Sequence, residues 1–198
     1  MSPETKEPGA HPARQALTPV DSAKEIPMSV APQNEFALSL EDVMNEHPAL
    51  NWGGYGAPRM RRSERDGWPE RFAAERAQLA GTEADVIRIA HWMRANLRPT
   101  KGAGPDSPSS YGTKHYAEND LGYITNGQFI AAAIMAGYPI HAHDYNPGIG
   151  VRARDITALH ERQNAARAAE YEAQAERRYV ARQAEQHAIR GWIAGSTS

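Results

Sequence analysis

Apolar residues recur at helical spacing through much of residues 35–154. The clearest run repeats every three or four positions and consists of Val86, Ala90, Met93 and Leu97. This spacing puts the four side chains on one side of a helix. The sequence therefore predicts a core-facing helix that opens at Thr82 and ends before Pro99.

Local start signals predict shorter helices before this one. Ser39 is followed three residues later by Asp42, as a capping pair requires, and Pro69 suits the first turn of another helix. Between them, residues 51–56 (Asn-Trp-Gly-Gly-Tyr-Gly) lack the Gly-Lys-Ser/Thr ending of a phosphate-binding loop. We expect this segment to be a flexible connection anchored by its two aromatic side chains.

Two further short helices are expected after a Pro/Gly-rich loop at residues 99–108, which is predicted to be mobile. Ser109 or Ser110 can cap the first helix, and Thr125 or Asn126 can cap the second. Each of these two helices is expected to end in a turn at a glycine, the first at Gly122 and the second at Gly137.

A β-hairpin is predicted directly after the second of these helices. Its strands are expected at residues 139–143 and 149–153, on either side of turn residues 144–148. Period-two alternation would place five apolar side chains on one face: Ile140, Ala142, Ile149, Val151 and Ala153. The outward face would then carry His141, His143 and Arg152. Two short helices followed by a hairpin favour a helix-turn-helix core with a wing.

Three sequence motifs stand out within residues 90–155. They are Ser-Tyr-x-x-Lys-His-x-x-Glu from Ser110, Gly-Tyr-Ile-Thr-Asn-Gly-x-Phe-Ile-x-Ala from Gly122, and Ala-Gly-Tyr from Ala136. Through these motifs, residues 90–155 resemble a module found in small phage- and plasmid-borne proteins of unknown function. The resemblance covers about a third of the chain and implies an origin in a mobile element. It brings no established activity and no catalytic residues.

The last part of the chain predicts a long polar helix. From Asp155 to Ile193 the sequence is dominated by Ala, Glu, Arg and Gln, which all favour helix. A weak seven-residue repeat and several aromatic residues indicate a helix that binds a partner rather than a core helix. The predicted partner-binding residues are Leu159, Ala166, Tyr171, Tyr179, Val180 and Trp192. The alternative is an exposed helix that folds back onto its own domain.

Taken with the composition of the N-terminus, these elements predict three regions. Residues 1–34 contain frequent prolines and are expected to form an extended or disordered tail. Residues 35–154 form the helical domain that ends in the hairpin, and residues 155–198 form the long helix and a short tail. The predicted fold is thus mainly α with a small β-hairpin: a helix-turn-helix or winged-helix-like core, a long C-terminal helix and an extended N-terminal tail.

The net charge and the cysteine content exclude some classes of function. The net charge of −2 over 198 residues argues against a general polyanion binder, and the absence of cysteine excludes disulfides and thiolate metal sites. Residues 1–58 carry 3 basic and 8 acidic side chains, whereas residues 151–198 carry 8 basic and 6 acidic ones. Neither a signal peptide nor an apolar run long enough for a membrane helix is evident, so a cytoplasmic or phage-particle location is expected.

The predicted helix pair and hairpin also suggest an alternative function, which is DNA binding. The side chains that would contact the duplex are Lys114, Asn126, Gln128, Arg152 and Arg154. However, three nearby acidic residues oppose the three cations, and the predicted reading helix contains no Lys or Arg.

An enzyme is the third possibility. Tyr111, His115 and Glu118 fall on one helical face beside Lys114, and a carboxylate can orient a histidine as a general base. His141 and His143 could together approach a metal. An exposed ion pair and two exposed histidines explain the same residues more simply, so no catalytic residue, cofactor or metal is expected.

The sequence thus favours a non-enzymatic structural or interaction protein of a phage or related mobile element. Its tail and long helix would contact neighbouring protein subunits, either other copies of the chain or other components of an assembly. A winged-helix-like DNA-binding protein is the second hypothesis, and a histidine- or metal-dependent enzyme is the third.

Overall fold

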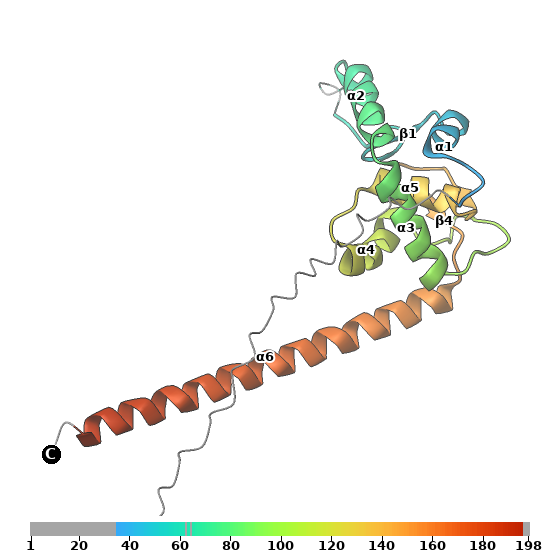
Figure 1. The fold of residues 1–198 in the computed structure, drawn as a ribbon. Coiled ribbons are helices and arrows are strands. Elements are labelled where there is room, and N and C mark those ends of the chain that lie inside the picture. Colours follow the sequence, from blue (N-terminus) through green and yellow to red (C-terminus); the bar gives the residue numbers. More distant parts are fainter. Residues whose placement is uncertain (1–34, 62, 64, 196–198) are drawn as a thin grey trace, which may run out of the picture. The chain divides into compact units, whose positions relative to one another are not determined.

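The computed structural model describes residues 35–61, 63 and 65–195, with side chains up to Arg190 except that of Ala188. The tail predicted for residues 1–34 lies outside the described residues, as do residues 196–198. The described part of the chain is mainly α-helical, with six helices and two small antiparallel hairpins (Figure 1). The expectation of a mainly α fold with a long C-terminal helix is therefore confirmed.

The helices are α1 (Leu40–Glu46), α2 (Trp68–Ala80), α3 (Glu83–Asn96), α4 (Ser110–Leu121), α5 (Asn126–Met135) and α6 (Ala153–Gly195). The strands are β1 (Leu50–Asn51), β2 (Gly54–Tyr55), β3 (Ile140–His141) and β4 (Gly148–Ile149). β1 pairs with β2, and β3 pairs with β4 through the partners Ile140 and Ile149.

Side-chain caps define most of the helix starts that the sequence predicts. Ser39 opens α1 and Thr125 opens α5, each in a reciprocal capping box with the residue three positions later. Ser109 opens α4 by accepting a hydrogen bond from the Gly112 amide. Thr82 precedes α3 without such a cap, because its hydroxyl donates to the Leu79 carbonyl instead.

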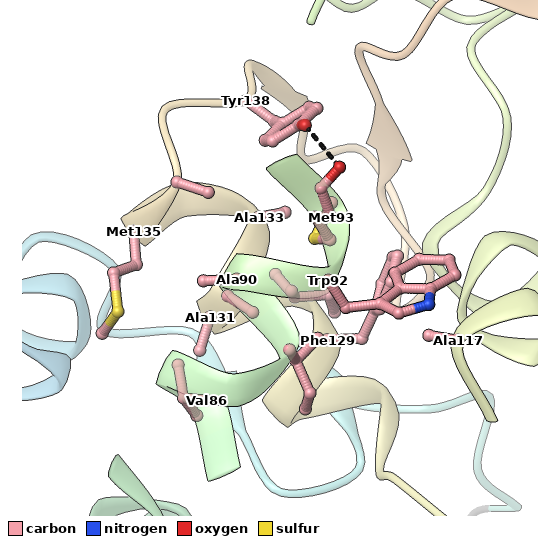
Figure 2. Packing of buried hydrophobic residues seen from close by; sticks show 14 of the residues in the cluster. Val86, Ala90, Trp92, Met93, Ala117, Phe129, Ala131, Ala133, Met135 and Tyr138 are labelled. Carbon is pink, nitrogen blue, oxygen red and sulfur yellow. Dashed lines mark hydrogen bonds between the residues drawn. The ribbon is translucent and has the colours of Figure 1, made fainter. Parts of the chain in front are cut away.

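Helix α5 lies at the centre of the hydrophobic core. Nine of its ten residues are buried, and it packs against α1, α3 and α4. Small side chains such as Ala131 and Ala133 let α3 approach closely, and Phe129 fills space near Trp92 (Figure 2). A helix surrounded by neighbours must be apolar on all sides, which explains its run of alanines.

Tyr138, just after α5, links that helix to α3 through its hydroxyl. Its hydroxyl lies 3.0 Å from the Met93 carbonyl and 2.7 Å from the Leu97 carbonyl, so it bonds the end of α3 (Figure 2). Burial raises the pKa of the Tyr138 phenol to about 12, while the positive charge of Arg94 opposes the shift and Asp155 adds to it.

The glycine-rich segment at residues 51–56 is an ordered hairpin, so the expectation of a flexible connection is wrong. Asn51 is fully buried, and its side-chain oxygen accepts hydrogen bonds from the amides of Gly53 and Gly54. Its side-chain amide donates to the carbonyls of Ala49 and Gly56. One side chain therefore satisfies both ends of the turn and holds it closed.

The hairpin of β3 and β4 exists, but it is shorter than predicted and is not a free wing. Isolated bridges pair Val151 with Pro99 and Gly148 with Ser109, and the Thr100 amide donates to the Gly150 carbonyl. Pro99 and Ser109 thus pair with the hairpin at the two ends of an otherwise irregular loop, and the mobility of that loop stays a prediction.

The predicted alternation along this hairpin is correct only for its central residues. Ile149 and Val151 are buried and Ile140 is partly buried, but Ala142 and Ala153 are exposed. The polar side chains His143 and Arg152 are exposed as expected, and His141 is half-buried. Ala153 faces solvent because it already belongs to the first turn of α6.

Helix α6 begins at Ala153, two residues before the predicted boundary at Asp155. Asp155 accepts a hydrogen bond from the Arg98 amide, which fixes the first turn of α6 against the end of α3. Among the described residues, no helix is both long enough and apolar enough to cross a membrane.

Candidate interaction surfaces

The polar face of α4 is the best-ordered cluster of chemically active side chains. Lys114 Nζ lies 2.6 Å from Glu118 Oε1, and His115 Nδ1 lies 2.5 Å from Glu118 Oε2. The Tyr111 ring stands edge-on to His115 with the ring centroids 4.7 Å apart, and Lys114 Nζ lies 5.1 Å from the Tyr111 centroid. The predicted proximity of these four residues on one helical face is therefore confirmed.

Glu118 is the shared acceptor of this cluster. Partial burial acts to raise the pKa of the Glu118 carboxyl, but hydrogen bonds and charges from Lys114 and His115 outweigh it and hold the pKa below its usual value. Both carboxylate oxygens are engaged, and the Lys114 side chain is only 7% exposed. This arrangement ties two turns of α4 together.

The two histidine rings of the hairpin lie against each other at a tilt of 33°. The rings of His141 and His143 are 4.5 Å apart, and the His143 amide and Nδ1 both approach the His141 carbonyl. The part of the chain that the structure describes contains no group of three or more His, Asp or Glu residues placed to hold a metal ion.

The residues expected to contact DNA do not form a common surface. Lys114, Asn126 and Gln128 are 6%, 5% and 5% exposed, whereas Arg152 and Arg154 are exposed. Lys114 is paired with Glu118, Asn126 donates to Asn146, and Gln128 completes the capping box of α5. Three of the five side chains are therefore directed to internal partners. Asn126 and Gln128 are buried because the start of α5 packs into the domain, and Lys114 is held by Glu118 on α4.

The first turns of α6 belong to the domain core. Leu159 is 2% exposed, and the Gln163 side chain donates to the Tyr116 carbonyl and to Asp120 on α4. Arg162 reaches Asn96 on α3. The expectation that Leu159 binds a separate partner is corrected by this burial, because its side chain already packs within its own domain.

The rest of α6 is in a different environment. Every residue from Asn164 to Arg190 whose side chain the structure describes is exposed. The large side chains Tyr171, Tyr179, Val180 and Ile189 are 74%, 59%, 55% and 51% exposed. Of the predicted partner-binding residues, Ala166, Tyr171, Tyr179 and Val180 are therefore accessible, and the Trp192 side chain lies outside the described residues.

One side of this exposed segment forms a shallow recess between two tyrosines, which we call the arm face. It is lined by Tyr171, Gln174, Ala175, Arg178, Tyr179 and Arg182. Residues three, four, seven and eight positions apart share one side of a helix, so this set follows directly from the sequence spacing. Among the described residues, neither Arg178 nor Arg182 has an ion-pair partner.

No protein-family model matches the chain. Comparisons with curated proteins and with solved structures also give no match. The resemblance of residues 90–155 to mobile-element proteins therefore stays a prediction.

The sequence did not reveal a second recess, which lies between α1, α2 and α3 and which we call the acidic groove. Its floor is formed by Leu40 and Met44, and its rim by Glu41, Asn45, Ala80 and Glu83. The Arg76 guanidinium also borders it, but donates to the carbonyls of residues 44, 47, 48 and 50 and so serves the end of α1. The only available signal was acidic composition, since residues 35–58 carry four acidic and no basic side chains.

Proposed function

We propose that this chain is a non-enzymatic structural or interaction protein and that α6 beyond Gln163 is its partner-binding arm. The observation that carries the proposal is the exposure of Tyr171, Tyr179, Val180 and Ile189 on a helix segment whose described residues are all exposed. Following the sequence resemblance, we place the protein in a phage or related mobile element.

A helix in water gains little from propensity alone, and in proteins most helical stability comes from packing of one face. Exposed aromatic and branched side chains also leave apolar surface in water, which association can remove at about 25 cal/mol per Å². A partner would supply the packing that the domain does not provide.

Partner binding by the arm can be tested in the native host by replacing Tyr179 with a photo-crosslinking amino acid. The matched control carries the same amino acid at Tyr123, which is 82% exposed and lies between α4 and α5. We expect discrete crosslinks to protein from position 179 and none above background from position 123. Equal labelling at the two positions would remove the arm from the proposal.

A winged-helix-like DNA-binding protein remains the alternative. Its support is the order of α4, α5 and the β3–β4 hairpin, together with exposed Arg152 and Arg154. The burial of Lys114, Asn126 and Gln128 speaks against a reading surface at the start of α5.

A further inference from the structure

We propose that the partner of the arm is a second copy of this chain, and that the arm face of one copy docks into the acidic groove of the next. This inference rests on the proposed function, because it names the partner of the same arm. It is carried by two recesses on different elements whose charges and side-chain types complement each other.

The first surface, the arm face, is cationic and aromatic. Its lining contains Arg178 and Arg182 and no acidic residue, and Tyr171 and Tyr179 stand on either side of Ala175. Tyrosine and arginine are the side chains most often found at the energetic centre of protein interfaces. A small residue between two tyrosines leaves room for a ridge of the opposing surface.

The second surface, the acidic groove, has an apolar floor and a carboxylate rim. Leu40 and Met44 form the floor, and exposed Glu41 and Glu83 stand on the rim, where Glu83 also accepts a hydrogen bond from the Leu40 amide. Arg76 is the one cation of the lining, and its guanidinium is directed to backbone carbonyls. Helix α1 itself carries three acidic residues and no basic one. A tyrosine ring from the arm would cover the floor, and the flanking arginines would then meet the carboxylates.

Each copy offers one arm face and one groove, so a copy can bind two contacts of this kind. If two copies exchange arms, they form a closed symmetric pair. If each arm docks on a further copy, the contact builds a ring or an open chain. Within one copy the arm face is exposed, so it is not already docked in its own groove.

The test uses charge reversals in the full-length purified chain, followed by sedimentation velocity at about 50 mM salt. Wild type is expected to show concentration-dependent association that weakens as salt is raised, since charges contribute to the contact. Arg178→Glu should weaken association at least about tenfold, because it places a carboxylate against the acidic rim. Arg177→Glu is the matched control, because its charge change is the same but it lies about 160° around the helix from Ala175.

The groove side has an equivalent pair of variants. Glu41→Lys, on the groove rim, should weaken association as Arg178→Glu does, whereas Glu46→Lys should not, because Glu46 is an exposed residue of α1 outside the groove lining. Circular dichroism of each variant checks that the domain remains folded.

Mixing provides the decisive measurement. Arg178→Glu protein keeps its groove and Glu41→Lys protein keeps its arm, so an equimolar mixture is expected to associate although neither variant does so alone. Failure of the mixture to associate would overturn the head-to-tail contact, as would equal effects of Arg178→Glu and Arg177→Glu. A wild-type chain that stays monomeric while Tyr179 crosslinks to a different protein would overturn this inference but leave the proposed function standing.

Discussion

At the residue scale, Tyr138 combines a buried hydroxyl with two carbonyl acceptors on α3. Only one of them can receive its single proton at a time, and deprotonation would leave both facing a negative charge. The burial that raises the pKa of the phenol thus favours its neutral form in the folded chain.

This preference for the neutral form predicts a pH-dependent loss of stability. Burial raises the pKa of Tyr138 to about 12 in the folded chain from the 10.0 of an unperturbed tyrosine. Its contribution to stability is therefore fully present below pH 10 and is lost as pH rises toward 12. Tyr138→Phe should lower the free energy of unfolding by about 1 kcal/mol at neutral pH, because the acceptors lose their donor. Urea unfolding of both proteins between neutral pH and pH 11 should show the difference shrinking.

Tyr123→Phe is the control for this measurement, because Tyr123 is 82% exposed. It should follow wild type at every pH. A constant difference between wild type and Tyr138→Phe across the whole range would contradict the assignment of the pH effect to Tyr138.

At the scale of elements, the β1–β2 hairpin meets the first turn of α5 without space for a side chain. A Cβ atom at Gly127 would lie 1.9 Å from the Asn51 carbonyl oxygen and 2.7 Å from that of Trp52. The Gly127 amide also donates to the Trp52 carbonyl at 3.1 Å. Backbone therefore packs on backbone here, and neither element can shift without breaking this contact.

Gly127→Ala should consequently destabilise the domain by about 2 kcal/mol or more, through overpacking against backbone. Gly112→Ala is a matched control, since Gly112 also lies in the first turn of a helix and its Cβ would meet only the Ser109 hydroxyl at 3.2 Å. That control should change stability by less than about 1 kcal/mol. Similar losses in the two variants, measured by chemical denaturation, would show that the contact with Asn51 is not what matters.

The helices and their caps were predicted from the sequence more accurately than the burial of individual side chains. Ser39, Ser109 and Thr125 were correctly expected as caps, because capping depends on residues within one helical turn. Burial depends on distant segments instead. Asn126 and Gln128 look like surface polar residues in the sequence, and only the packing of α5 against its neighbours shows that they are buried.

The same distinction applies to the candidate surfaces. Of the arm face, Tyr171 and Tyr179 were predicted to bind a partner, and the other four lining residues share their side of the helix but were not predicted. The acidic groove was not predicted, because it is assembled from α1, α2 and α3, and no local pattern reports how separate helices meet. Likewise, the ordered turn at residues 51–56 depends on buried Asn51, and the glycine-rich sequence does not indicate that Asn51 is buried.

At the scale of the whole molecule, folding of the domain and presentation of the arm are separable. The described contacts of α6 with other elements end at Gln163, and the following described residues are exposed. Removal of residues 168–198 should therefore change the free energy of unfolding of the domain by less than about 0.5 kcal/mol. Chemical denaturation of the truncated and full-length chains checks this, and a large loss would mean that the arm stabilises its own domain.

Helix α6 runs without a break from Leu159 to Tyr179, so the number of residues between them fixes how far Tyr179 lies from the domain. Twenty residues separate these two positions, which corresponds to about 30 Å along the helix axis. An insertion of about 18 residues, or five turns, would lengthen that distance by about 27 Å and still present the tyrosines on the same side. The spacing between neighbours in an assembly built through this arm would thus be encoded in residue count, and could change without altering either contact surface.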